Sequence, residues 1–349
     1  MQIQKVIDES RRMDHMGPKV SLIIVNWNGK AFISKCFGSL LRQQYKNIEI
    51  IIVDCASTDN SIGFLKKKYG NDKRVKIVSL KTDPGPPAAV NMACRQYARG
   101  KYVLILNNDV ILPADCVSKL LENVDDGNAV LNPLQLDFKR RFIPWTFHEP
   151  WVSPIIFKIT RLFMNIGGYS IFYPSTACCF LRKDIILKNP LNEHLFLYED
   201  TEWGWRLFLK NIRLKIVFDT YFLHANAGTV KDTEKIAFVL GRIAIATSFI
   251  CFSTPVFICV LPLLLLRVIS KLIYYLLKLR PKHAFAYLSG FMNFLINIRT
   301  FISDKRRVQR GRKVNDLNVI SFMLQSNAYS DYLRKNAKDY VKKLFVRPE

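Results

Sequence analysis

Three short clusters of acidic and amide side chains carry most of the reactive chemistry in this sequence. In the first, Asp109 directly follows Asn107 and Asn108. Such hard oxygen donors suit Mg²⁺ or Mn²⁺ that is also held by a diphosphate, and a metal there would neutralise charge on a departing diphosphate. The alternative is an aspartate that caps the next helix or turn, which is a common role for this residue type.

The second cluster starts at Asp54, directly after an apolar run. Its carboxylate can accept hydrogen bonds from a ribose or from a base edge. Ser57 or Asp59 could also serve as the N-cap of a helix around 60–69. Both roles can hold together, because different residues would perform them.

The third cluster, Glu199, Asp200 and Glu202, places three carboxylates within four positions. Like charges this close raise at least one pKa, which suits a general base. The alternative is a charged helix N-terminus, where the helix dipole favours acids. His224 is equally open, because a lone histidine after a strand is more often structural than a ligand.

The segments around these clusters predict a sheet that brings them together. Near-continuous apolar runs suit strands buried on both faces, and they occupy 20–25, 48–53, 75–80 and 102–107. Apolar stripes at helical spacing lie between them, at 31–41 and 88–97. This alternation predicts an α/β fold with a mostly parallel sheet flanked by helices. Ligands bind beyond the carboxyl ends of such strands, where the polar residues are Asn26, Asn28, Asp54, Ser57, Asn107, Asn108 and Asp109.

The later segments give a coarser prediction. Residues 125–175 are rich in aromatic residues and proline, which predicts loops and an acceptor-side face. Residues 196–211 predict a loop that enters a helix, and 214–228 predict a strand and a loop that carry His224.

The net charge and the composition limit the classes of partner that this protein is expected to bind. The 349 residues fit one large domain with an appendage, and the net charge is +24. Such a balance points to nucleic acid, an anionic membrane face or phosphorylated substrates. Eight cysteines without a CxxC pair argue against structural zinc and favour a reducing compartment. The N-terminus has no apolar core of a signal peptide, so no secretory signal is predicted.

The C-terminal region predicts membrane attachment. Residues 243–266 hold no charged side chain and are long enough to span a bilayer, although Pro255 and Pro262 could kink them. A second apolar run covers 284–298. Basic residues flank the runs, which favours a hairpin or interfacial helices at about 243–298 on the cytoplasmic face of the cell membrane. The alternative is a buried helix within a soluble domain.

Four segments, taken in order, resemble family 2 glycosyltransferases, especially the rhamnosyltransferase-like branch. The resemblance covers about residues 19–230 and is carried by VSLIIVNWNG, SLLRQQYKNIEIIIVDCASTDNS, NMACRQYARGKYVLILNNDV and LFLYEDTEWGWRL. It implies a GT-A domain at 19–235, between a polar lead-in at 1–18 and a helical, basic, membrane-associated region at 236–349. It also implies an inverting hexosyl- or rhamnosyl-type transferase of polysaccharide biosynthesis. The donor would be a nucleoside diphosphate sugar, the acceptor a hydroxyl of a lipid-linked or cell-surface glycan, and the cofactor Mg²⁺ or Mn²⁺.

The same resemblance implies roles for individual residues. Asp200 would be the catalytic base, with Glu199 beside it. Asp109 would be the metal-binding aspartate of a DxD-type motif, and His224 would face the metal or the diphosphate. The nucleotide-sugar set would comprise Asn26, Asn28, Asp54, Ser57, Asn91, Asn107, Asn108 and Arg206, with Asp54 on the nucleoside and Arg206 also supporting the helix that carries the base.

Three other classes compete with this interpretation. A dinucleotide-dependent oxidoreductase would share the sheet, but its GxGxxG cradle is missing after the first strand. A nucleic-acid-binding protein would fit the charge, yet no helix-turn-helix, zinc-finger or RNP motif is present, so no nucleic-acid partner is predicted. A non-catalytic homologue that binds a nucleotide or a glycan is disfavoured by the intact Asp109 and Asp200.

Overall fold

A computed structural model describes residues 17–125, 127–141, 174–195, 199–225, 233–321, 335 and 339–341. Within these residues one sheet has the strand order β3-β2-β1-β4-β7-β6-β8-β5. The strands are β1 (Val20–Asn26), β2 (Ile48–Asp54), β3 (Val75–Ser79), β4 (Tyr102–Asn107), β5 (Val110–Ile111), β6 (Ala129–Leu136), β7 (Cys178–Arg182) and β8 (Arg213–His224).

The first half of this sheet is parallel, as the four apolar runs predict. β1 pairs in parallel with β2 and β4, and β2 pairs with β3. Alternate side chains of β1 enter two cores: Leu22 and Ile24 pack on one face of the sheet and Ile23 on the other. The register places Asn26 beside Asp54, and Val25 beside Asn107. The predicted polar strand ends therefore lie along one edge.

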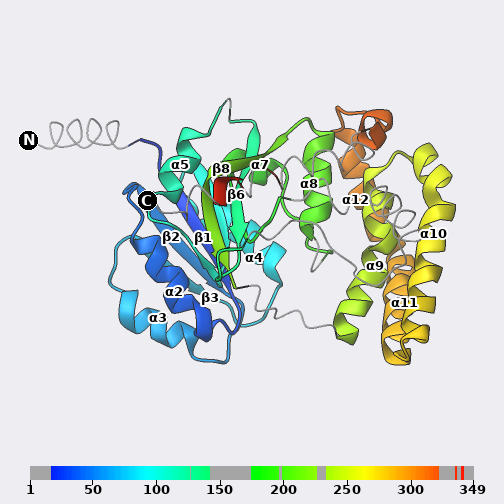
Figure 1. The fold of residues 1–349 in the computed structure, drawn as a ribbon, viewed down its shortest axis with the longest axis horizontal. Coiled ribbons are helices and arrows are strands. Elements are labelled where there is room, and N and C mark those ends of the chain that lie inside the picture. The colour runs from blue at the N-terminus through cyan, green and yellow to red at the C-terminus, as the bar shows by residue number, and fades with distance from the viewer. Residues whose placement is uncertain are drawn as a thin grey trace, which may run out of the picture.

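Helices cover both faces of the sheet (Figure 1). They are α2 (Lys30–Leu41), α3 (Ser61–Tyr69), α4 (Pro86–Met92) continued by a π-helical turn at Ala93–Tyr97, α5 (Cys116–Glu122), α7 (Lys183–Lys188) and α8 (Glu199–Leu209). Asn60, and neither Ser57 nor Asp59, occupies the N-cap position of α3, although Asp59 Oδ1 accepts the N–H of Ser61, the first residue of the helix, at 3.0 Å.

The prediction of loops across 125–175 is wrong at 129–136, where the chain forms the buried strand β6. Two features hide this strand in the sequence. Asn132 is polar, but its amide donates to the carbonyl oxygens of Ser175 and Cys178, at 3.1 and 2.7 Å. Pro133 lies at a register shift in the ladder with β8, where a missing N–H is tolerated. The part of this prediction at 142–173 falls outside the described residues.

The single apolar run predicted at 243–266 is divided between two helices. These are α9 (Glu234–Cys251) and α10 (Thr254–Leu277), which are followed by α11 (Pro281–Ile296) and α12 (Ile298–Arg310). The break precedes Pro255, in the first turn of α10, because proline lacks an N–H and restricts the residue before it. Along α9 the run is buried, so the buried-helix alternative holds there. Among the described residues, α10 is the one helix long and apolar enough to cross a membrane, and 22% of its most apolar window is buried.

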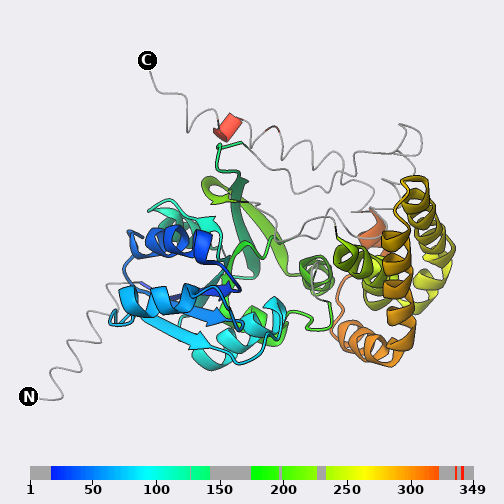
Figure 2. The same cartoon turned by 90° about the horizontal axis from the view of Figure 1, so that it is seen from below.

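Helix α8 lies between the sheet and the C-terminal helices in both views (Figures 1 and 2). Its fully buried side chains divide between two cores. Trp203 and Leu207 pack with the sheet, whereas Trp205 and Leu209 pack with α9 and its neighbours. The predicted domain boundary near 235 stays a prediction, and this sharing means that the two regions are packed together through α8.

Two glycines lie where α9 and α11 approach each other closely. A Cβ on Gly290 of α11 would lie 1.8 Å from the carbonyl oxygen of Phe238 in α9. A Cβ on Gly241 of α9 would lie 1.9 Å from the carbonyl oxygen of Tyr287. Both contacts are with backbone, so no side-chain rotation can relieve them.

We expect Gly290→Ala to lower the free energy of unfolding by about 1–3 kcal/mol or more, because α9 and α11 must separate. Gly38→Ala in α2 is the matched control: its Cβ would meet only the flexible end of Arg42, at 3.3 Å. That change should be neutral or stabilising by about 0.5–1 kcal/mol, since alanine is the better helix former. Urea denaturation of both variants measures the difference, and equal stability would contradict the backbone contact.

Candidate active site

Asn26 at the end of β1 is the centre of a buried hydrogen-bond network. Its side-chain amide donates to Asp54 Oδ1 at 2.8 Å, to Ser61 Oγ at 2.9 Å and to Ser57 Oγ at 3.2 Å. Its oxygen accepts from the Asn108 amide at 3.0 Å. The ends of β1, β2 and β4 are therefore linked side chain to side chain, as predicted for the edge.

A second layer of the network holds the turn after β2. The backbone N–H of Asn28 donates to Ser57 Oγ at 2.8 Å, and the Asn28 side chain accepts from the Thr58 N–H at 2.8 Å. Asn28 has a positive φ of 47°, a conformation that asparagine tolerates better than most residues. Gly29 follows it, and a Cβ there would collide with the Asn26 and Asn108 side chains. Four predicted residues thus form one rigid edge with Asp54.

The Asp54 carboxylate can accept a further hydrogen bond from a ligand at this edge. Its Oδ1 accepts from Asn26 and from Ser57 Oγ, and its Oδ2 accepts the Ser57 N–H at 3.1 Å. A carboxylate has about four lone-pair sites, so in the described part of the chain Oδ2 can accept one more donor. Burial, with the charges of Asp83 and Asp54, raises the pKa of the neighbouring Cys55 thiol to about 12, which keeps it protonated.

Asp109 and His224 come together through the short ladder between β5 and β8. Val110 pairs with His224, and the Ala225 N–H donates to the Asp109 carbonyl at 3.2 Å. This places His224 Nε2 3.0 Å from Asp109 Oδ1, with both side chains about one-sixth exposed. His224 Nδ1 lies 3.0 Å from Gln135 Nε2. A Gln135 amide that donates to Nδ1 leaves the proton on Nε2, facing Asp109, whereas a cation at Nε2 requires the other tautomer, with the Nδ1 proton donated to the Gln135 oxygen.

Two donors in adjacent positions of an octahedral ion, each about 2.1 Å from it, lie about 3.0 Å apart. The observed separation is therefore compatible with a divalent cation, and it is also the distance of a direct hydrogen bond between the two side chains. No group of three His, Cys, Asp or Glu side chains that could hold a metal occurs in the described residues. Mg²⁺ in enzymes is commonly held by one or two protein groups with waters and substrate phosphates. Exposed Asn107 and half-buried Asn108 adjoin the pair along the chain.

Glu199 and Asp200 form the first turn of α8, and both are buried, with 8% and 7% of their surface exposed. Asp200 Oδ1 accepts the N–H of Thr201 at 2.9 Å. The field of Asp200 reaches β7, where burial, the Cys94 thiol and Asp200 together raise the pKa of Cys179. Cys179 pairs with Ile105 in β4, the strand that ends at Asn107.

The third acid of the cluster has a structural role instead. Glu202 is fully buried and accepts two hydrogen bonds from the Arg206 guanidinium, at 2.8 and 3.0 Å. Arg206 also donates to the Pro190 carbonyl at 2.8 Å. These contacts agree with the predicted support of the base-carrying helix. The hydrogen-bond partners of Arg206 lie within α8 and in the segment that precedes it.

Asn91 forms its hydrogen bonds with the segment at 189–195. Its amide donates to the Leu191 carbonyl and to Glu193, and its oxygen accepts the Leu191 N–H. Asn91 therefore holds the segment at 189–195, which leads toward Glu199. Its predicted contact with the nucleotide sugar stays a prediction.

Two further residues near the site were not found from the sequence. Gln135 orients His224, but it lies in a segment without readable periodicity. Asp304 of α12 accepts from Asn192 at 3.0 Å and lies 3.2 Å from His194, so α12 also holds the segment at 189–195. The signal for Asp304 was present, because it is the one acidic residue between Glu234 and Asp316.

We expect Arg206→Met to lower the free energy of unfolding by about 3–5 kcal/mol, because Glu202 would be left buried without its partner. The double variant with Glu202→Leu should recover much of this loss, since it removes the stranded charge. Arg74→Met is the control: its pair with Asp72 is 38% and 26% exposed and should contribute about 0–1 kcal/mol. Urea denaturation separates the cases, and a double variant with the full sum of the single losses would contradict the pairing.

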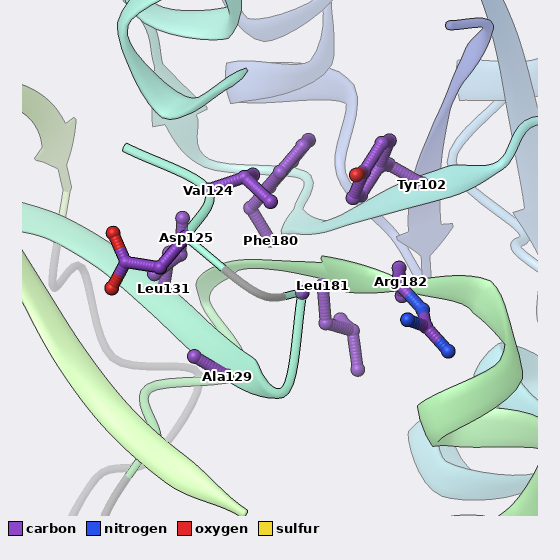
Figure 3. Close-up of a pocket in the computed structure, with 9 residues that line it drawn as sticks. Tyr102, Val124, Asp125, Ala129, Leu131, Phe180, Leu181 and Arg182 are labelled. Carbon is purple, nitrogen blue, oxygen red and sulfur yellow. The ribbon is translucent and has the colours of Figure 1, made fainter. Parts of the chain in front are cut away.

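A small pocket lies at the opposite edge of the sheet. Tyr102 and Arg182, which line it, pair at the start of β4 and the end of β7, and Phe180 and Asp125 complete its wall (Figure 3). Asn107 and the polar edge are at the other end of β4. We therefore place the candidate active site at the Asn26–Asp54–Asp109 edge.

Comparisons with known proteins identify the family of the sheet domain and its fold. Residues 21–188 match the family model described as Glycosyl transferase family 2. An uncharacterized glycosyltransferase of Haemophilus influenzae is 36% identical over 114 residues, which are 33% of this chain and 45% of that protein. The poly(ribitol-phosphate) beta-N-acetylglucosaminyltransferase TarS of Staphylococcus aureus is 23% identical over 210 residues, 59% of this chain and 35% of TarS. The matched segments span less than half the length of these two relatives.

A solved structure extends the fold similarity further along the chain. S. aureus TarS 1–349 in complex with UDP-GlcNAc superposes with a TM-score of 0.52 at 20% identity, covering 93% of this chain and 92% of that one. At this identity the similarity concerns the fold alone. The sheet and its helices thus have the GT-A architecture, and the domain that contains residues 21–188 matches glycosyl transferase family 2.

Proposed function

We propose that this chain transfers a sugar from a nucleoside diphosphate sugar to an acceptor hydroxyl with inversion at the anomeric carbon. One observation carries the proposal: a family 2 domain whose strand ends join Asn26, Asp54, Ser57 and Asn108 in one network, with Asp109 and His224 3.0 Å apart at the same end of β4. The network would receive the nucleoside at Asp54.

In the proposed reaction, Asp200 takes the proton from the acceptor hydroxyl. The acceptor oxygen attacks the anomeric carbon from the face opposite the diphosphate. The new C–O bond forms as the bond from the anomeric carbon to the diphosphate oxygen breaks, so a single displacement inverts the configuration. General base catalysis contributes about 10²–10⁴-fold. Burial of Glu199 and Asp200 excludes water from around the base.

Asp109 and His224 would hold Mg²⁺ or Mn²⁺, supported by the 3.0 Å separation of their donor atoms. Such an ion, when bound, neutralises negative charge on the leaving diphosphate. Asn107 and Asn108 would line the sugar-diphosphate side. Arg206 and Asn91 would act through position, because their contacts are with α8 and with the segment at 189–195.

The donor and acceptor classes are part of the proposal. The similarity to TarS, which is named as a beta-N-acetylglucosaminyltransferase and was solved with UDP-GlcNAc, favours a UDP-sugar donor. A dTDP donor, expected for the rhamnosyltransferase-like branch, is the alternative. The acceptor would be a hydroxyl of a lipid-linked or cell-surface glycan. Apolar α10 and the basic residues around it support a location at the cytoplasmic face of the cell membrane.

A donor panel tests this function on the detergent-solubilised full chain. UDP-, dTDP- and GDP-sugars are compared by thermal shift with Mn²⁺ and with EDTA. Stabilisation by one nucleotide class that requires the metal supports the proposal and identifies the nucleotide. The absence of a shift with every nucleotide, in protein that unfolds cooperatively, would favour the non-catalytic or nucleic-acid-binding classes.

A further inference from the structure

Helices α10 and α11 present two exposed apolar stripes. On α10 the stripe includes Ile258, Ile269 and Leu276, which are 61%, 52% and 55% exposed. On α11 it includes Phe285 and Ile296, at 75% and 78%. Further exposed apolar residues at helical spacing complete both stripes: Leu265, Leu266, Ile273, Leu277, Leu288, Met292 and Leu295. An apolar surface this extensive is unusual on a soluble monomer and marks a binding face. We call it the α10–α11 face.

The charged residues within and between α10 and α11 are all basic. Lys278, Arg280 and Lys282 are exposed at the turn between the two helices, and Arg299 is exposed beyond α11. The sequence contains no acidic residue between Glu234 and Asp304. An apolar face with a purely basic margin is complementary to anionic lipid, whose headgroups attract lysine and arginine next to the acyl layer.

The packing of α10 determines how it can meet a bilayer. The stripe opposite the exposed one is buried in the C-terminal core through Phe257, Leu264, Val268 and Tyr275. α9, which shares this core, packs in turn against α8. α10 is therefore one outer wall of a folded unit, and both views place it with α11 at the end of the molecule away from the sheet (Figures 1 and 2).

The lengths of α10 and α11 also restrict how these helices can meet a bilayer. α10 has 24 residues, about 36 Å, and could cross a bilayer of about 30 Å. α11 has 16 residues, about 24 Å, and is too short to return across it. α11 is also fixed to α9 by the Gly241 and Gly290 contacts, so α10 cannot enter the membrane upright without separating from this pair or pulling it in.

We propose that α10 and α11 lie in the plane of one leaflet of an anionic bilayer, with the α10–α11 face submerged and the basic turn among the headgroups. The chain is then monotopic, and α10 does not span the membrane. The proposal refines the membrane location given above, because it specifies the α10–α11 face as the surface that contacts the bilayer. It rests on the helices alone and is independent of the transferase reaction.

Vesicle flotation tests the surface with the full chain. The wild-type chain should bind vesicles of phosphatidylcholine with phosphatidylglycerol more strongly than vesicles of phosphatidylcholine alone. The double variant Ile269→Asp, Phe285→Asp should bind at least tenfold more weakly. Leu187→Asp is the matched control, because Leu187 is an exposed leucine (44%) on the sheet domain, and it should bind like the wild type. Thermal denaturation of each variant verifies folding. Equal binding by the double variant and the control would overturn the proposal.

A second experiment tests the basic residues at the margin of the α10–α11 face. Replacing Lys278, Arg280 and Lys282 together with glutamine should remove the preference for anionic vesicles while leaving the weaker binding to phosphatidylcholine. An unchanged preference would show that the margin does not contact headgroups, and would contradict the proposed orientation.

Cysteine labelling separates the in-plane from the spanning arrangement. Cys259 is the one exposed cysteine among the eight, so Cys259→Ala gives a background with buried thiols only. Thr254→Cys and Lys278→Cys then mark the two ends of α10. A membrane-impermeant maleimide should label both from the same side of sealed membrane vesicles. Labelling from opposite sides would overturn the in-plane arrangement. Loss of nucleotide binding in any variant concerns the proposed function and leaves this result unaffected.

Discussion

Asp200→Asn is expected to lower kcat by about 10²–10⁴-fold, the contribution of a general base, while nucleotide-sugar affinity stays within about twofold. The asparagine keeps the shape of the side chain, and its oxygen can still accept the Thr201 N–H. It cannot take a proton from the acceptor. Initial rates with saturating donor, compared with donor binding by calorimetry, separate the two effects.

Glu199→Gln is the matched control for this prediction. Both acids are in the first turn of α8 and equally buried, so the two variants change charge and hydrogen bonding in the same setting. We expect the smaller loss from Glu199→Gln, because Asp200 remains. If Asp200→Asn weakens donor binding as much as it slows turnover, Asp200 holds the donor or the fold and is not the base. A larger loss from Glu199→Gln would transfer the role to Glu199.

The edge of the sheet was predictable because parallel strands have a simple sequence pattern. Strands buried on both faces require near-continuous apolar residues, and the polar residue that ends each strand is then conspicuous. Asn26, Asp54 and Asn108 could therefore be placed on one edge before their contacts were known. Their mutual hydrogen bonds could not, because these depend on the register between strands.

The residues that orient the site were harder to predict, since they act across long sequence distances. Gln135 contacts His224 from β6, a strand that is difficult to recognise in the sequence because it contains Pro133. Asp304 of α12 accepts a hydrogen bond from Asn192 in the segment at 189–195. The basic charge of the C-terminal region predicted only membrane association for it. Glu202 seemed to belong to a catalytic cluster, and only burial with Arg206 shows that it is structural. Local sequence carries the identity of a polar group, whereas its role depends on its partner.

Helix α8 packs against both the sheet and the C-terminal helices, so the C-terminal region affects the candidate site. Asp200 lies on the helix whose Trp205 and Leu209 belong to the core of α9–α12. Asp304 of α12 holds the segment that leads toward Asp200, at 3.0 Å from Asn192. The C-terminal helices therefore position the proposed base, and a truncation that removes them is expected to lose activity even where the sheet still folds.

Asp109→Ala is expected to weaken donor binding in Mn²⁺ by at least about tenfold, with no change in EDTA, because one of the two proposed protein ligands to the metal is lost. The backbone pairing around it should persist, since the Ala225 N–H bonds to the Asp109 carbonyl and not to the side chain. Asp115→Ala is the control: Asp115 is a nearby acid whose pair with Lys119 is about one-third exposed. Thermal shift with and without metal measures both. The alternative role of Asp109 as a turn cap makes the opposite prediction, namely a lower Tm without ligand and an unchanged metal dependence of binding. The pair of measurements therefore decides whether the 3.0 Å contact with His224 serves a cation or the turn.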